Sequence, residues 1–413
     1  MTHAPVIDIT NERRHVDDLT PALARRAGFT GVLVLVVGAI LGYVFGADHF
    51  AEQFLRSYLA SYCFFLSLAL GGLFFVLLQH LTYAGWSVVV RRLAEVVACA
   101  MPLMAILALP IVMAVLLGWK YPFSWANADV VAHDALIQKK QAYLNAPFFL
   151  LRTIIYFAVW IRLASYFHAK SVEQDTTGDV ELTRRMARVS APGMLLFAVT
   201  ITLFSFDYIM SLDPHWFSTI FGVYFFAGSA VGIFAVLIIM AYLLQREGRL
   251  ENVITTEHYH DVGKFMFAFI VFWAYIAFSQ YMLIWYANIP EETEWYHVRQ
   301  TGGWERVSLA LLFGHFFIPF LALISRHPKR RKNWLVAGAV WILLMHWIDI
   351  YWLTIPAAHD GAEPHASLHL LDATCLIGLG GLFVWSVAGR LAHQSLIPER
   401  DPRLAESLAF ENQ

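Results

Sequence analysis

The stretch FLRSYLASYCFFLSLALGGLFFVLLQ, residues 54–79, decides the fold class of this chain. Its single charged residue, Arg56, stands near the start, and the remainder is almost entirely apolar or aromatic. A helix that crosses the hydrocarbon core of a bilayer needs about 20 mostly apolar residues. The stretch is longer than that, so it predicts a membrane-spanning helix that tilts or protrudes from the bilayer.

The composition places the whole chain in the same class. Of its 413 residues, 59% are hydrophobic and 15% are charged, whereas a soluble domain has about 45–50% apolar and about 25% charged residues. The mean hydropathy is +0.57. The net charge of −2 provides no basic surface, so we expect no nucleic-acid partner.

Nine further runs of similar length and polarity predict the other spans. The alternation typical of outer-membrane β-barrel strands is absent from the sequence. We therefore predict an all-α integral membrane protein with ten transmembrane helices. The predicted spans are residues 27–46, 54–79, 94–118, 147–168, 190–212, 217–245, 261–288, 304–325, 334–355 and 368–393.

The distribution of Lys and Arg predicts the orientation of these spans. The N-terminal tail, every second connection and the C-terminal tail, with the adjoining span ends, carry 20 such residues, and the opposite side carries 5. Because Lys-rich and Arg-rich loops stay in the cytoplasm, both termini are expected there. The chain then divides into an N-terminal tail (1–26), a ten-helix transmembrane domain (27–393) and a C-terminal tail (394–413).

The three cysteines give no sign of a metal or haem site. Cys63, Cys99 and Cys375 all lie inside apolar runs, and the sequence has no CxxC or CxxCH motif. Zinc sites, iron–sulfur clusters and c-type haems normally use such motifs. We therefore expect buried thiols that pack as small hydrophobic side chains, and no metal, haem or iron–sulfur cluster in this chain.

Two long connections lie on the acidic, histidine-rich side opposite the termini. Residues 119–146 predict a short surface helix around 129–143, whose Val130, Val131 and Ile137 dip into the membrane interface. Residues 289–303 contain a glutamate cluster and a pair of glycines. Loops of this length either dock another molecule or form a solvated cap, and the sequence alone favours neither.

Ionisable side chains inside the spans are the candidate functional residues, because placing a charge in lipid is costly. A rise of about 1.5 Å per residue puts four of them at the middle or in the outer half of their spans. An imidazole or carboxylate there can titrate near neutral pH, as a proton relay requires. These candidates for proton transfer are Asp207, His315, His346 and Asp349.

Two pairs of these residue types are spaced i,i+3, which places both side chains on one helix face. The pairs are His346 with Asp349, and His369 with Asp372. Together with the four candidates they predict a polar track from the outer surface to the middle of the membrane. Its predicted mouth consists of Asp213, His369 and Asp372. Basic residues that extend the track or pair with its acids are Arg152, Arg162 and Lys264.

Other interpretations of the same residues remain open at this point. Each buried histidine can be a hydrogen-bonded structural residue between helices. His315 and His346, at mid-depth on neighbouring antiparallel spans, can also be axial ligands of a b-type haem. Buried carboxylates occur equally in secondary transporters, although those commonly have interrupted helices and repeats, and neither is evident in the sequence.

Four segments suggest a family. They are FSFDYIMSLDPHWFSTIFG (204–222), YHDVGK (259–264), FWAYIAFSQY (272–281) and WYANIPEET (285–293). In these segments the chain resembles the smaller ten-helix membrane subunit of alternative complex III, a bacterial quinol:electron acceptor oxidoreductase. The resemblance covers residues 190–355, and the remainder agrees in topology. That subunit is similar to the NrfD/PsrC type of quinone-handling membrane protein.

The resemblance implies a fold, a cofactor and a set of partners. The fold would be two four-helix bundles with two flanking helices, in the bacterial inner (cytoplasmic) membrane. The cofactor would be a quinone or quinol, either menaquinone or ubiquinone, without haem or iron–sulfur clusters in this chain. The implied partners are an iron–sulfur subunit with a molybdopterin-enzyme-like part, a paralogous ten-helix subunit, pentahaem and monohaem cytochrome c subunits, small membrane subunits, lipids and a terminal oxidase.

These inferences combine into one expected function with two alternatives. Quinol oxidation needs a base near the quinol hydroxyl, a route for the proton and an electron acceptor, and this chain offers only the first two. We expect a subunit that is not catalytic alone and that provides a proton-transfer pathway and a quinol-facing cleft to a quinol:electron acceptor oxidoreductase complex. The alternatives are a proton-coupled secondary transporter and a purely structural anchor for cytochromes. The candidate quinol contacts are Asp207, His215, Gln280 and His346.

Overall fold

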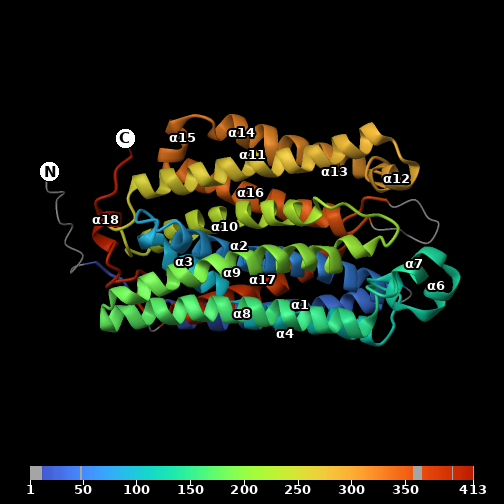
Figure 1. Ribbon diagram of the computed structural model, residues 1–413, viewed down its shortest axis with the longest axis horizontal. Helices are drawn as coiled ribbons and strands as arrows, with labels where there is room; N and C mark the ends of the chain where they lie inside the picture. The colour runs from blue at the N-terminus through green and yellow to red at the C-terminus, as the bar shows by residue number, and fades with distance from the viewer. Residues whose placement is uncertain (1–11, 47–48, 357–364, 393, 413) are drawn as a thin grey trace.

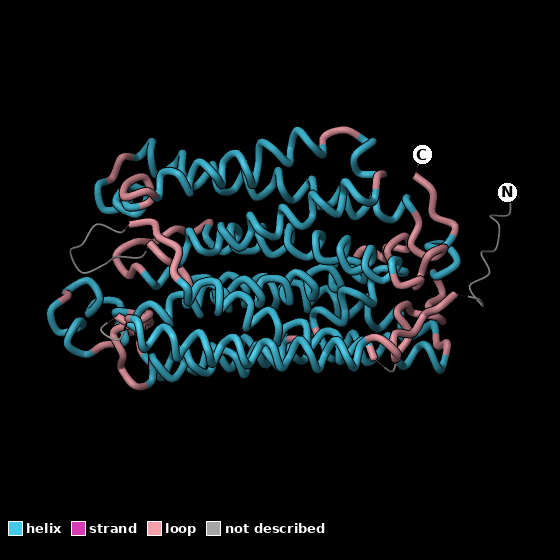
Figure 2. The backbone as a smooth tube through the Cα atoms, turned by 180° about the vertical axis from the view of Figure 1, so that it is seen from behind, coloured by secondary structure: helices cyan, strands magenta, loops and turns pink. Residues whose placement is uncertain are grey.

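The computed structural model describes residues 12–46, 49–356, 365–392 and 394–412. The chain is 78% helix, and the described residues contain no strand. Ten helices are long and apolar enough to cross a membrane, so the prediction of ten spans is confirmed and the chain is a multi-pass membrane protein. They run roughly parallel along the long axis of the molecule (Figures 1 and 2).

Most spans are single helices, and two consist of several segments. The spans are α1 (Thr20–Phe45), α2 (Phe50–Leu81), α3 (Val88–Ala98) with α4 (Met101–Leu107) and α5 (Leu109–Leu116), α8 (Ala146–Thr177), α9 (Val180–Tyr208), α10 (Phe221–Arg246), α11 (Thr256–Ala287), α13 (Trp304–Leu311) with the π-helix η3 (Leu312–Phe317) and α14 (Ile318–Leu323), α16 (Lys332–Thr354) and α17 (Leu370–Leu391). The short connecting helices are η1 (Ser124–Ala126), α6 (Ala128–His133), α7 (Ala135–Lys140), η2 (Met210–Leu212), α12 (Pro290–Val298), α15 (Arg326–Arg330) and α18 (Leu404–Leu408).

The third span is interrupted twice, against the expectation of continuous helices. Turns at residues 99–100 and 108 separate α3, α4 and α5. Pro102 and Pro110 stand in the first turns of α4 and α5. A proline has no backbone N–H to donate to the preceding turn and clashes with its carbonyl, so each proline ends the helix before it.

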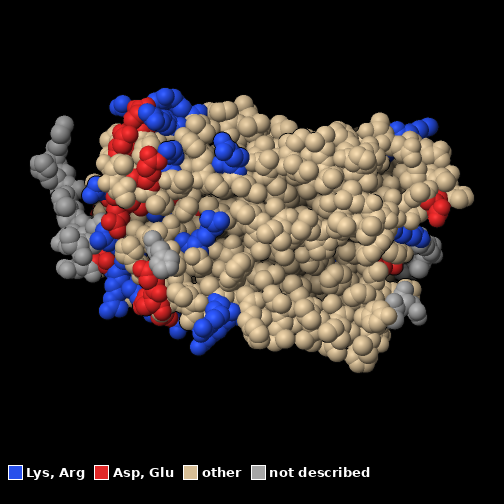
Figure 3. Space-filling view, turned by 90° about the horizontal axis from the view of Figure 1, so that it is seen from below, with Lys and Arg blue, Asp and Glu red and all other residues tan. Residues whose placement is uncertain are grey.

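The two ends of the helical bundle differ in charge. We call the end that carries residues 12 and 412 the terminal face, and the end with α6, α7 and α12 the distal face (Figure 1). Lys, Arg, Asp and Glu side chains gather at the terminal face, and the long surface between the two ends is largely free of them in the view of Figure 3. This uncharged belt is the part of the surface that a bilayer would cover.

Helices α2 and α10 form the centre of the molecule and are the most deeply buried spans. α10 packs on α2, α9, α11 and α16. Helix α1 lies at the edge and packs almost entirely on α17. That contact is at backbone distance, because a Cβ atom on Gly31 would lie 2.7 Å from the carbonyl oxygen of Gly378. Close contacts between small residues are a common way for helices to associate in lipid.

The C-terminal segment is tied to the terminal face. Asp401 forms a buried ion pair with Arg91 of α3, and the Ser407 hydroxyl donates to the backbone carbonyl of Trp86. The backbone N–H of Leu396 donates to the carbonyl of Arg14 at 2.8 Å, which joins the two ends of the chain. Residues 394–412 therefore lie across the ends of the helices.

The connection over residues 119–146 folds as two short helices, α6 and α7, where the sequence predicted one. Val131 and Ile137 are buried in the protein core and Val130 packs against it, so the expectation that these side chains dip into the membrane interface is wrong. Asn127 and Asp134 begin the two helices by accepting backbone N–H groups at their N-termini. This distal cap is held by its own hydrophobic side chains.

Candidate functional site

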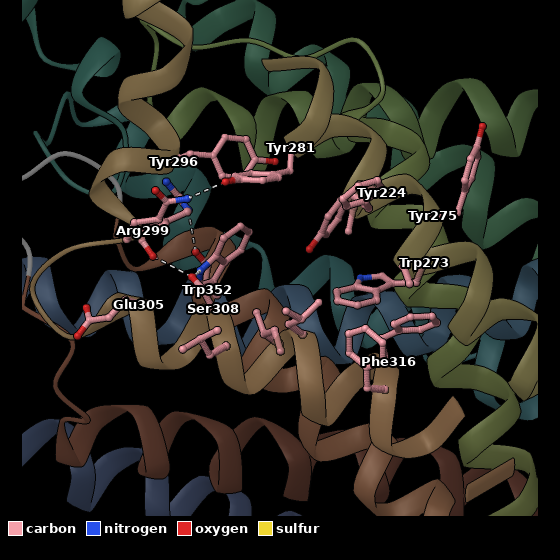
Figure 4. A pocket seen from close by; sticks show the side chains of 18 of the residues that line it. Tyr224, Trp273, Tyr275, Tyr281, Tyr296, Arg299, Glu305, Ser308, Phe316 and Trp352 are labelled. Carbon is pink, nitrogen blue, oxygen red and sulfur yellow. Dashed lines mark hydrogen bonds between the residues drawn. The ribbon is translucent and has the colours of Figure 1, made fainter. Parts of the chain in front are cut away.

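A cavity of about 830 Å³ lies between α11 and the segmented span α13–η3–α14, towards the distal face (Figure 4). We call it the cleft. Its volume falls in the range that small-molecule sites in proteins occupy, about 300–1,000 Å³. The side chains that line it are mostly aromatic or aliphatic: Tyr224, Val271, Trp273, Ala274, Tyr275, Ala277, Phe278, Tyr281, Tyr296, Arg299, Gln300, Glu305, Ser308, Leu309, Leu311, Leu312, Phe316, Phe317 and Trp352.

The mouth of the cleft opens through the side of the bundle. Tyr275 and Phe278 of α11 and Leu309 of α13 line it, and each is more than half exposed. All three lie within membrane-spanning helices, where an exposed side chain faces hydrocarbon. An apolar molecule dissolved in the bilayer could therefore enter the cleft without crossing water.

Arg299 closes the distal end of the cleft. It is fully buried and donates hydrogen bonds to the backbone carbonyls of Trp295, Trp352 and Leu353 at 2.9–3.2 Å. Its guanidinium lies 3.4 Å from the ring centroid of Trp295. The carbonyls belong to the C-terminal turns of α12 and α16, which are negative dipole ends. Burial lowers the pKa of Arg299 to about 9, so it remains charged at neutral pH.

Two tyrosine hydroxyls lie beside Arg299. Tyr296 accepts a hydrogen bond at 3.0 Å from the Gln280 side-chain amide, whose oxygen accepts from Ser218. Tyr281 accepts a long hydrogen bond, 3.4 Å, from Gln300. Neither hydroxyl donates its own proton to a residue that the structure describes. Gln280 is thus a support behind the cleft wall and not a lining residue.

Asp349 lies behind the opposite wall of the cleft. Its two carboxylate oxygens accept hydrogen bonds from the Tyr224 hydroxyl at 2.6 Å and from the Trp273 indole at 3.0 Å. The side chain is buried, and Arg and Lys are absent from its hydrogen-bond partners and ion pairs in the described part of the chain. Tyr224 and Trp273 both line the cleft, so they connect it to a buried acid.

His315 lies on the far side of Trp273. The two rings are stacked with centroids 3.9 Å apart, and neither nitrogen of the buried imidazole has a hydrogen-bond partner among residues 12–46, 49–356, 365–392 and 394–412. His315 belongs to η3, and such π-helical segments frequently occur at functional sites. The Trp341 indole donates to the backbone carbonyl of the preceding residue, Gly314, at 2.7 Å.

His346 lies one turn before Asp349 on α16. Its Nε2 is 2.7 Å from the Ser67 hydroxyl of α2, and its Nδ1 has no partner in the described structure. The ring fits against two glycines of α10, because a Cβ atom on Gly228 would lie 2.7 Å from Cε1 and one on Gly232 would lie 3.3 Å from Cδ2. Asp349, His315 and His346 form one buried group with Tyr224 and Trp273, which we call the α16 cluster.

Asp207, by contrast, belongs to a separate ion pair. Arg152 of α8 contacts both of its carboxylate oxygens, at 2.7 and 3.0 Å, and the Tyr156 hydroxyl donates to it at 2.7 Å. Arg152 also donates to the backbone carbonyl of Tyr143 in the distal cap. These contacts join α8, α9 and the cap, and none of them reaches the α16 cluster. The continuous track predicted from the sequence is therefore divided at this point.

The residues predicted for the mouth of the track have local roles. Asp372 and the exposed His369 cap the N-terminus of α17, and Asp372 also accepts from Ser57 at 2.5 Å and from Tyr351 at 3.2 Å. His215 lies 2.7 Å from Asp134 of α7, and Asp213 accepts its backbone N–H. Burial alone would raise the pKa of Asp134, but the hydrogen bond from the Ile137 N–H and the nearby His215 hold that pKa below its usual value.

The remaining basic candidates are distributed over the surface. Lys264 pairs with Asp261 on α11 and donates to Asn412. Arg162 is exposed on α8.

Cys63, Cys99 and Cys375 are free and buried, as predicted. Within the described residues no group of three or more His, Cys, Asp or Glu side chains could hold a metal ion.

A second buried ionic group, which the sequence did not reveal, lies near the terminal face. The carboxylate of Glu95 on α3 is fully buried. Its Oε1 lies 3.4 Å from Nε of Arg91, and its Oε2 lies 3.1 Å from Nε of Arg92 and 3.7 Å from Nδ1 of His168. Arg92 also pairs with Asp175. The positions of Glu95 and the two arginines, at the predicted boundary of a span, made them resemble ordinary loop charges.

Four further residues of the site were not predicted, because nothing in their local sequence sets them apart. Tyr224 and Trp273 occur in aromatic runs typical of lipid contact, and Ser67 is one serine among several in α2. Arg299 stands in a connection between two predicted spans, where a basic residue resembles an ordinary loop charge. Its proximity to a cleft depends on how α12 folds over α11, which no local pattern indicates.

No family model matches the chain, and no curated protein matches it either.

Proposed function

We propose that this chain is a membrane subunit of a respiratory quinol:electron acceptor oxidoreductase, and that it binds quinol in the cleft and carries protons through the α16 cluster. The observation that supports this best is an apolar, hydrocarbon-facing cleft in contact with two side chains that hydrogen-bond a buried acid, Asp349. A quinol supplies two electrons and two protons when it is oxidised, and it reaches its site through the bilayer.

The residues of this chain have distinct roles in the proposal. Asp349, with no cation beside it, serves as the base, and the Tyr224 hydroxyl passes a proton from the cleft to it. The orphaned nitrogens of His315 and His346 continue the route with bridging water, because a buried imidazole normally has hydrogen-bond partners at both nitrogens. The Ser67 hydroxyl of α2, which lies 2.7 Å from Nε2 of His346, is the next group on this route.

The helix contacts support the arrangement that the resemblance implies. Helices α2, α3, α8 and α9 contact one another around a ring, and α10, α11, α13–α14 and α16 do the same. We infer two four-helix bundles flanked by α1 and α17. The excess of Lys and Arg at the terminal face supports a cytoplasmic location for both termini in the bacterial inner membrane.

The partners in this proposal are those of alternative complex III. The electron acceptor belongs to an iron–sulfur or haem subunit, and the paralogous ten-helix subunit, the cytochrome c subunits, small membrane subunits and a terminal oxidase complete the assembly. The cofactor of this chain is menaquinol or ubiquinol. The transporter alternative is less well supported, because the breaks in the third span expose no unpaired polar side chain among residues 99–110.

The test is the Asp349→Asn variant in the purified assembly. We expect quinol turnover to fall about 100-fold or more, because general-base catalysis contributes roughly 10²–10⁴-fold, while the subunits still co-purify. The matched control is Asp261→Asn on α11, which changes a carboxylate that pairs with Lys264 outside the cluster.

Two results would overturn the proposal. Turnover of Asp349→Asn at the level of Asp261→Asn would support a structural anchor instead. Purification of the chain alone, without any haem-containing partner, would support a carrier.

A further inference from the structure

The two ends of the cleft have opposite hydrogen-bonding chemistry. At the distal end, Arg299 uses three of its five N–H groups on carbonyls, and the Tyr296 and Tyr281 hydroxyl protons have no acceptor in the described structure. At the inner end, the Tyr224 oxygen and the Asp349 carboxylate behind it accept protons. Glu305 also lines the cleft, but its carboxylate already accepts the Gly303 N–H at 2.8 Å and lies 3.9 Å from Arg306. The distal end therefore offers uncommitted donors, and the inner end offers acceptors (Figure 4).

From this asymmetry we infer that the cleft binds its ligand in one orientation, with a ring oxygen held by Arg299 and Tyr296 and a second oxygen on the opposite edge of the ring facing Tyr224. This inference rests on the proposed function and specifies it. The ligand class is a lipid-borne aromatic ring with oxygens on opposite edges and an apolar tail. A ring with a single oxygen would satisfy only one end of the cleft.

The apolar walls fit the rest of such a molecule. Trp273 and Phe316 line one end, Trp352 lines the other, and a flat ring packs favourably against aromatic side chains. The tail would leave past Tyr275, Phe278 and Leu309 into hydrocarbon. An acyl chain of a phospholipid would also fill the apolar part, but it offers no hydrogen-bond donor for the Tyr224 oxygen and the Asp349 carboxylate at the inner end.

Arg299 has a structural role as well, since it caps α12 and α16. Its replacement by lysine keeps the charge but loses the planar donor geometry. Tyr296→Phe is the cleaner variant, because it removes only the hydroxyl and leaves the ring against Trp295, whose centroid is 4.9 Å away. Its side effect is confined to the Gln280 amide, which loses one acceptor.

The experiment uses the full chain in nanodiscs of zwitterionic phospholipid and titrates a short-tailed ubiquinol analogue that is kept reduced, because a quinol hydroxyl can donate to the inner end and a quinone carbonyl cannot. Binding is read from quenching of tryptophan fluorescence, to which Trp273 and Trp352 in the cleft wall contribute. We expect saturable binding to the wild type and about tenfold weaker binding to Tyr296→Phe and Arg299→Lys, as for the loss of one strong hydrogen bond. Tyr166→Phe, on α8 and away from the cleft, is the control and should bind as the wild type does.

A ring analogue with one carbonyl gives the second arm. Its carbonyl accepts from the distal donors but cannot donate to the inner end, so the wild type should bind it about tenfold more weakly than the quinol, and Tyr296→Phe should weaken its binding about tenfold further. Equal quinol affinity of the wild type and both variants overturns the orientation but leaves the proposed function intact. Absence of saturable binding to the wild type, with phospholipid retained by the protein, overturns the quinol cleft itself.

Discussion

Gly228 and Gly232 on α10 determine where the His346 imidazole can lie. The ring occupies the space that a Cβ atom on Gly228 would need and lies 3.3 Å from the position of one on Gly232, and its Nε2 is 2.7 Å from the Ser67 hydroxyl. A glycine in a helix normally costs about 0.5–1 kcal/mol relative to alanine. Here the missing side chain leaves room for the polar imidazole ring to pack against the backbone of α10.

Replacing Gly228 with alanine should therefore displace the imidazole. The new Cβ would lie 2.7 Å from Cε1, and crowding of this kind costs about 1–3 kcal/mol. We expect a lower thermal midpoint in detergent and reduced quinol turnover in the assembly, because the Ser67 contact is lost. Gly389→Ala on α17 is the matched control, since no atom of the described residues lies within 4 Å of a Cβ atom there. Identical behaviour of the two variants would refute the role of Gly228.

At the scale of elements, the hairpin of α8 and α9 is closed by one buried ion pair. Arg152 and Asp207 meet in bidentate geometry, and Tyr156 and the Tyr143 carbonyl complete their hydrogen bonds. A buried pair is strongly destabilising when only one partner is removed, because the other charge is left unpaired. Asp207 therefore has a structural role that its sequence position alone did not reveal.

The Asp207→Asn variant separates this role from proton transfer. We expect it to destabilise the chain by about 3–5 kcal/mol, measured by chemical unfolding in detergent. Combining it with Arg152→Gln should restore part of the loss, as a double-mutant cycle detects for coupled residues. If Asp207 instead carries protons, the single variant will unfold like the wild type and lose only turnover.

The sequence predicted the spans better than the site, and the reason is physical. Lipid requires about 20 apolar residues for each crossing, so all ten spans are readable from composition along the chain. The i,i+3 spacing puts His346 and Asp349 one turn apart on α16, because that needs only the geometry of one helix. Their hydrogen-bond partners lie on other helices, which the spacing does not indicate. The separation of Asp207 from Asp349 depends on which helices are neighbours: α9 packs on α8, and α16 packs on α10.

The segmented spans show the same limit. Pro102 and Pro110 are visible in the sequence, yet prolines also occur in uninterrupted spans, as Pro192 does inside α9. The π-helix around His315 has no local sequence signal at all. It is compatible with the surroundings that Trp341 and Met345 of α16 provide for Gly314, and those contacts exist only in the folded bundle.

At the scale of the whole molecule, the terminal face is held together by side chains from distant parts of the chain. Asp401, near the C-terminus, pairs with Arg91, which also lies near Glu95. Burial alone would raise the pKa of Asp401, but the Arg91 guanidinium holds it below the usual value of 3.8. The pair therefore stabilises the fold at pH values above 3.8, and this contribution is lost as the pH falls through the lower pKa of the folded state.

Asp401→Asn should release the C-terminal segment at neutral pH. The expected loss is about 3 kcal/mol, at the low end of the range for a broken buried pair because Arg91 keeps Glu95 as a partner. A bimane label on a cysteine at position 410 reports it, because Phe410 lies 6.2 Å from the ring of Trp86, an efficient quencher at contact, and the three native cysteines are buried. Fluorescence should rise in the variant at pH 7, and in the parent protein only below about pH 3.8. A label that stays quenched in Asp401→Asn would mean that Ser407 and α18 hold the segment without the ion pair.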